Sequence, residues 1–140
     1  SEQTVKVIEE AARIAGGCSV EEITALHVYD GSINIRYWSK GYVPSGDDLE
    51  RYLELEKQVR AKSEQVLSDA VKRLEEKNLM VKGLFKEGHP AETITKVAAE
   101  EGIDLIILGS RGLGGLKKMI LGSVSNAVIQ EVGTNVLVVK

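Results

Sequence analysis

The sequence has little cysteine, few aromatic residues and no long apolar run. Cys18 is its only cysteine, so an internal disulfide and a cysteine-based metal site are excluded. Aromatic residues make up 4% of the chain, so aliphatic side chains must fill the core. No stretch has the length of a membrane span or reads as a signal peptide. We therefore expect a protein of the reducing cytoplasm that does not enter a membrane.

The sequence also lacks an excess of positive charge. The chain has 18 Lys and Arg against 21 Asp and Glu, a net charge of −3. Proteins that bind nucleic acid usually present a basic face, so we do not expect a nucleic-acid partner. The two histidines, His27 and His89, are too far apart to form a metal site, and His27 is more typical of a structural histidine. A length of 140 residues fits one domain, residues 1–140.

Strand-like and helix-like patterns alternate along the chain. We predict helices at 1–15, 49–77, 90–101 and 123–132, and strands at 22–29, 79–85, 103–108 and 136–139. Residues 105–108 are all aliphatic, which is typical of a parallel strand covered on both faces. The first half of the helix at 49–77 is polar and should project from the body. The pattern predicts an α/β fold with an open, mostly parallel, doubly wound sheet.

A glycine-rich stretch follows the strand that ends at Leu108. In open α/β sheets, ligands bind beyond the carboxyl ends of the strands. Glycines let the backbone take positive φ and approach a ligand, and the helix that starts near Ser123 would aim free amides at a phosphate. The glycines and the polar residues around them are Gly109, Arg111, Gly112, Gly114, Gly115, Gly122, Ser123 and Ser125. We expect this stretch to hold phosphate.

Two familiar glycine motifs fail on inspection. A P-loop needs lysine directly after its second glycine, but Gly115 stands there. A dinucleotide fingerprint needs a third glycine where the chain has Lys117. Neither a Walker-type nucleotidase nor a nicotinamide-dependent dehydrogenase is supported.

The spacing that fits is Gly109, two residues, Gly112, nine residues, then Gly122 and Ser123. This spacing resembles the ATP-binding branch of the universal stress protein (UspA) family. The resemblance extends to residues 25–28, 88–92, 102–106 and 135–139 and so covers nearly the whole chain. It implies the adenine nucleotide alpha hydrolase-like fold.

The resemblance also implies a ligand, its site and a partner. ATP, with or without Mg²⁺, would be held by Val28, Leu108, Gly109, Arg111, Gly112, Gly122, Ser123, Val124 and Ser125, with Val28 meeting the adenine through its backbone. Family members are usually homodimers joined through the last strand, here Val136, Leu137, Val138 and Val139. An apolar edge strand also needs a cover on physical grounds.

Three functions stay open at this point. The first is a regulatory ATP-binding homodimer in stress-response signalling, favoured because no general base is evident. The second is a slow ATPase or autophosphorylating protein in which Ser123 or Ser125 accepts phosphate. The third is a dimeric interaction module that binds no nucleotide.

The chain departs from the family at its start. Family members begin with a strand that ends in an acidic residue contacting adenine, and this sequence begins after that strand. The strand is central in the family sheet, so we expect two unpaired inner edges and a sequence that is part of a longer protein. Direct pairing of the strand of Val28 with the strand of Ile106 would show this topology to be wrong.

Overall fold

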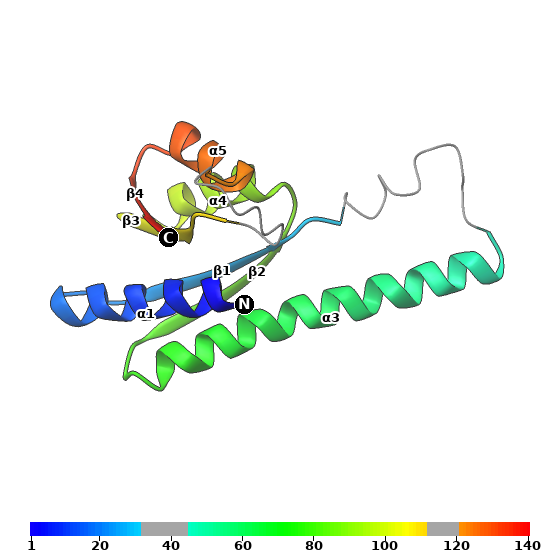
Figure 1. The fold of residues 1–140 in the computed structure, drawn as a ribbon, viewed down its shortest axis with the longest axis horizontal. Helices are drawn as coiled ribbons and strands as arrows, with labels where there is room; N and C mark the ends of the chain where they lie inside the picture. Colours follow the sequence, from blue (N-terminus) through cyan, green and yellow to red (C-terminus); the bar gives the residue numbers. More distant parts are fainter. Residues whose placement is uncertain (32–44, 112–120) are drawn as a thin grey trace.

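The computed structural model describes residues 1–31, 45–111 and 121–140 and shows an α/β fold (Figure 1). The elements, in chain order, are α1 (Glu2–Gly17), β1 (Ile23–Tyr29), α3 (Asp47–Glu75), β2 (Val81–Glu87), α4 (Pro90–Glu100), β3 (Leu105–Gly109), α5 (Ser123–Glu131) and β4 (Asn135–Val139). Every predicted helix and strand is present, with ends shifted by a few residues. Gly112, Gly114 and Gly115 lie outside the described residues.

Local chemistry explains where the helices begin and end. The Ser1 hydroxyl accepts a hydrogen bond from the Thr4 amide at 3.2 Å and caps α1. Pro90 occupies the first turn of α4, where a missing amide costs nothing. Gly102, with φ +61, stops α4 as predicted, because glycine takes this left-handed conformation without a steric penalty. None of the described helices combines the length and apolarity needed to cross a membrane.

The strands form two separate parallel pairs. β1 pairs with β2, from Ile23 opposite Val81 to Tyr29 opposite Glu87. β3 pairs with β4, from Leu105 opposite Asn135 to Gly109 opposite Val139. β1 does not pair with β3, so both inner edges lack a strand partner among the described residues. The sheet is therefore divided where the sequence analysis expects it.

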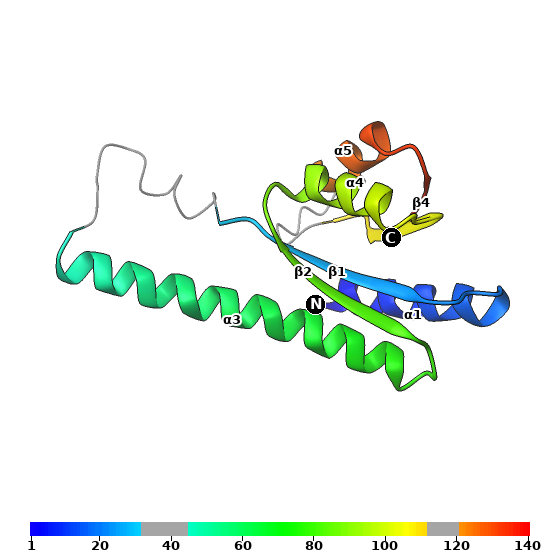
Figure 2. The same ribbon diagram turned by 180° about the vertical axis from the view of Figure 1, so that it is seen from behind.

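Helices cover both sides of the strands. α3 packs on β1 and β2, and a side chain at Gly83 would start 3.1 Å from Val71 of α3. α1 contacts β3 and β4, while α4 packs against α5 and touches β1. The first half of α3 extends past the strands in both views (Figures 1 and 2), as its polar sequence predicts.

The core is small. Its buried apolar residues are Ile8, Tyr29, Leu74, Ala91, Val97, Ala98 and Val128. The accessible surface is 10066 Å², whereas a compact chain of 15.2 kDa has about 7,100 Å². Leu105 is 37% exposed, so the full cover predicted for the strand at 103–108 is not reached there. We attribute this exposure to the inner edge of β3, where no described strand lies beside Leu105.

Candidate functional site

The predicted site lies where β3 ends and α5 begins. The Gly122 amide donates to the Ser110 carbonyl at 2.8 Å, and the Ser125 hydroxyl donates to the Gly109 carbonyl at 2.8 Å. The Ser110 amide donates to the Val139 carbonyl at 2.8 Å, which continues the pairing of β3 with β4. The bonds of Gly122 and Ser125 hold the start of α5 at the carboxyl end of β3.

The N-terminus of α5 has no side-chain cap. Gly122 is its N-cap residue, and because glycine has no side chain, the N-cap position accepts no side-chain hydrogen bond from the first turn. The first amides of an α-helix have no acceptor within the helix, and they carry the positive end of the helix dipole. Ser123 is exposed and Val124 half-buried. This end of α5 therefore has the chemistry that binds an anion.

Two groups expected to be ligand donors are already bonded within the protein. The hydroxyl of Ser125, a residue only 3% exposed, is bonded to Gly109, and the Gly122 amide is bonded to Ser110. Ser125 thus connects α5 to β3, and the amides of Ser123 and Val124 are among the donors at the helix start that have no acceptor among the described residues.

The expected left-handed backbone is absent at Gly109 and Gly122. The described glycines with positive φ are Gly46, Gly88 and Gly102, and Gly122 has φ −59. Gly109 is needed for another reason, because a Cβ there would lie 2.8 Å from the Gln3 side chain. The Gln3 side-chain amide in turn donates to the Val139 carbonyl at 2.6 Å. No sequence signal pointed to Gln3.

The backbone of Val28 faces the inner edge of β1. The Ile23 amide donates to Met80 at 2.9 Å, and the Gly88 amide donates to Tyr29 at 3.0 Å. Because alternate residues of a parallel strand bond to the same neighbour, Ile23 and Tyr29 face β2 whereas Val28 faces the other way. Its amide and carbonyl are thus directed away from β2.

The same alternation applies to β3. Since the Ser110 amide bonds to Val139, the backbone of Leu108 faces β4 and that of Gly109 faces the inner edge. Arg111 is exposed directly beyond the strand. The structure thus describes every predicted site residue except Gly112, and it brings those of β3 and α5 together.

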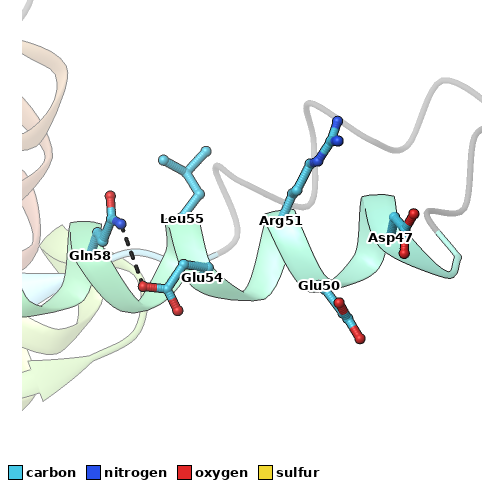
Figure 3. Close-up of a pocket in the computed structure, with 6 residues that line it drawn as sticks. All are labelled: Asp47, Glu50, Arg51, Glu54, Leu55 and Gln58. Atoms are coloured by element: carbon cyan, nitrogen blue, oxygen red, sulfur yellow. Dashed lines mark hydrogen bonds between the residues drawn. The ribbon is translucent and has the colours of Figure 1, made fainter.

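Two hollows of the described surface lie away from these residues. One of about 740 Å³ runs along the first half of α3 and is lined by Asp47, Glu50, Arg51, Glu54, Leu55 and Gln58 (Figure 3). Its one hydrogen bond joins the Gln58 amide to Glu54 at 3.4 Å. One helix supplies all the lining residues, so no described residue forms an opposite wall. A second hollow, of about 530 Å³, lies between α3 and β2. Neither includes a predicted site residue.

The described titratable groups do not form a metal site. Within 1–31, 45–111 and 121–140, no three His, Cys, Asp or Glu side chains gather closely enough to hold a metal ion. His27 stacks on Phe85 with ring centroids 5.7 Å apart, and burial lowers the pKa of its imidazole. The stacking agrees with the structural role predicted for His27.

Comparison with known proteins gives consistent matches. The universal stress protein family model matches residues 1–140. The universal stress protein YxiE of Bacillus subtilis is 32% identical over 100% of this chain and 93% of its own length.

Solved structures agree. The structure of MJ0577, a universal stress protein of Methanocaldococcus jannaschii, superposes with a TM-score of 0.78 at 30% identity, covering 96% of this chain and 85% of that one. A universal stress protein from Archaeoglobus fulgidus, solved in complex with dAMP, has a TM-score of 0.67 at 20% identity over 100% of this chain and 90% of its own, which shows the shared fold alone. The chain belongs to the universal stress protein family.

Proposed function

We propose that this protein binds an adenine nucleotide, ATP in the first place, where β1 and β3 end and α5 begins, and that it acts as a regulatory protein in the stress response. The observation that carries the proposal is the uncapped start of α5, held at the end of β3 by the bonds of Gly122 and Ser125. The A. fulgidus relative in complex with dAMP supports adenine nucleotides as the ligand class.

The phosphates would bind at the start of α5. The amides of Ser123 and Val124 and the positive end of the helix dipole attract negative oxygens, and the exposed guanidinium of Arg111 adds a full positive charge. Gly112, the other glycine of the family spacing, belongs to the same proposed site. Mg²⁺ would bind through the phosphates and waters rather than through a cage of side chains.

The adenine would bind between the ends of β1 and β3. Adenine presents a hydrogen-bond donor next to an acceptor, which an amide and a carbonyl of one residue can match. Val28 offers such a pair, because its backbone faces the inner edge. Main-chain recognition reads the base without requiring a particular side chain at this position.

Calorimetry with ATP, ADP and AMP, each with and without Mg²⁺, tests the proposal. We expect saturable binding with ATP tightest, because its phosphates reach furthest along the start of α5. Absence of binding for all three would refute the proposal and leave an interaction module. Phosphate release, followed in the same samples, measures turnover separately from binding. We place the protein in the cytoplasm, where an exposed cysteine such as Cys18 stays reduced.

We propose further that two copies join through the outer edge of β4, at Val136–Val139. The backbones of Asn135, Leu137 and Val139 face β3, so those of Val136 and Val138 face outward. Val136→Pro removes an outward amide and leaves the bonds to β3 intact. We expect this variant to lose the β4 dimer in sedimentation experiments while its circular dichroism stays unchanged. A variant that associates through β4 as the wild type does would contradict the proposal.

A further inference from the structure

The outer edge of β2 is open. The bonds at Met80 and Gly88 show that Lys82, Leu84 and Lys86 face β1, so Val81, Gly83, Phe85 and Glu87 turn their backbone groups outward. No described residue forms a backbone hydrogen bond with this outward side. An open edge of this kind is a template for a further strand.

A hollow lies beside this edge. It measures about 530 Å³, and its apolar floor is formed by Leu67 and Val71 of α3 with Phe85 of β2. Gly83 is exposed at the rim and contributes no side chain. A strand added at the edge would therefore direct one side chain into the space over Gly83. The charged residues Glu64 and Lys72 of α3 border the same hollow.

We propose that a second copy of this chain occupies this edge, with its own β2 antiparallel to the first. A register with the two-fold axis at Leu84 sets Phe85 of each copy opposite the partner's Gly83. Both residues direct their backbone groups outward, so the pair can exchange two hydrogen bonds. The Phe85 ring then covers the glycine of the neighbouring strand, an arrangement known to stabilise sheet glycines.

The helices above this edge fit the same axis. Ser68 borders the hollow, and Glu64 and Lys72 stand four residues to either side of it on α3. Two antiparallel copies of α3 related by an axis near Ser68 bring Glu64 beside the partner's Lys72, twice. Since α3 packs over both β1 and β2, the two helix axes would be separated by about two strand spacings, roughly 10 Å. That is the usual distance between packed helices.

The edge of β2 and the adjoining face of α3 are complementary to themselves, which favours a second copy of this chain over a strand from another protein. The contact of Phe85 with Gly83 and the contact of Glu64 with Lys72 each occur twice, related by the two-fold axis. An isologous interface requires this symmetry. The other face of the sheet has an unfavourable contact. Lys82 would lie opposite the partner's Lys86, although Lys82 is also paired with Glu101 at 2.8 Å.

Charge exchange across the helices tests the proposal. All variants are made in the full chain carrying Val136→Pro, because this substitution removes association through β4. Sedimentation equilibrium then measures dimerisation through β2 alone. We expect Glu64→Lys to raise the dimer dissociation constant at least tenfold by placing two lysines together. Lys72→Glu added to Glu64→Lys should restore it to within threefold. Lys86→Glu should lower it, since a carboxylate then meets the partner's Lys82.

Glu54→Lys is the matched control, because it makes the same charge change in the first half of α3, which extends past the strands (Figures 1 and 3). It should leave the dissociation constant unchanged. All these positions except the half-buried Val136 are exposed, and circular dichroism checks that each variant is folded. A Val136→Pro chain that is monomeric at every concentration would overturn the proposal, as would equal effects of Glu64→Lys and Glu54→Lys or a failure of the double exchange to restore association.

Discussion

At the scale of single residues, the site depends on the absence of side chains as much as on their presence. Gly122 directly precedes the first amides of α5, so we expect a branched side chain at this position to crowd a phosphate bound at the proposed site. Gly109 lies so close to Gln3 that a methyl group would meet it at 2.8 Å. The two glycines serve different purposes, although the sequence motif treats them alike.

Gly122→Val should therefore abolish nucleotide binding. Loss of two charge-assisted hydrogen bonds weakens affinity by at least about 100-fold, since each contributes about 1.5–3 kcal/mol. Calorimetry with ATP measures this, and thermal unfolding shows whether the fold survives. Gly133→Val is the matched control, because a side chain at Gly133 meets nothing within 4 Å. Normal ATP binding by the Gly122 variant would disprove the proposed site.

His27 makes stability depend on pH. Burial against Phe85 lowers the pKa of its imidazole below the ordinary value of 6.5. The unfolded chain therefore takes up this proton first as the pH falls below 6.5, and the native state loses stability until the folded imidazole is protonated as well. Well above pH 6.5 the residue is neutral in both states and contributes no pH dependence.

Urea unfolding of the wild type and of His27→Gln between pH 8 and pH 5 measures this effect. We expect the midpoint of the wild type to fall more steeply below about pH 6.5 than that of the variant. Identical slopes in the two proteins would show that His27 has the same pKa in the folded and unfolded states.

At the scale of elements, the turn between β2 and α4 has a backbone conformation that few residues can adopt. Gly88 has φ +152, and a Cβ there would lie 2.8 Å from the Thr93 hydroxyl oxygen. Its amide also donates to Tyr29 at 3.0 Å, which ties the end of β2 to the end of β1. The positive φ and the close approach of Thr93 favour glycine at this turn, and the main-chain bond to Tyr29 excludes proline.

Gly88→Ala should lower the free energy of unfolding by about 1–3 kcal/mol, the usual cost of a forced unfavourable backbone conformation. Denaturant titration measures the loss. Gly16→Ala is a suitable comparison, because its Cβ meets nothing within 4 Å and helix α1 favours alanine over glycine. Equal stabilities for the Gly88 variant and the wild type would show that this turn can relax.

Element identity was largely predictable from the sequence, whereas contacts at the site were not. Pro90 marks the start of α4 and Gly102 marks its end, each through its own backbone chemistry. A local sequence pattern is therefore enough to predict where this helix begins and ends. Ser125 appeared as a phosphate donor because it follows a helix start. Its bond to Gly109 joins residues 16 positions apart, and no local pattern reports such a contact.

At the scale of the whole molecule, the divided sheet governs both stability and access. β1 and β3 each have one side without a strand partner among the described residues, and the accessible surface is correspondingly large. The same division leaves the backbones of Val28 and Gly109 facing the inner edges, where the nucleotide is proposed to bind.

Amide hydrogen exchange should reveal the division. In β1, the amides of Ala25 and His27 face β2, whereas those of Thr24 and Leu26 face the inner edge. We expect the second pair to exchange markedly faster, because no strand among the described residues protects it. NMR exchange measurements resolve the alternation residue by residue. Uniform protection along β1 would mean that the inner edge is paired in solution.

The sequence by itself determined the order of helices and strands, the family and the location of the glycine-rich stretch, since these follow from local periodicity, glycine and proline chemistry and motif spacing. Only the tertiary structure decided which strands pair, which backbone groups face the inner edges and which site hydroxyl is already bonded. Those features depend on contacts between residues far apart in the chain, whose partners are set by packing rather than by neighbouring sequence.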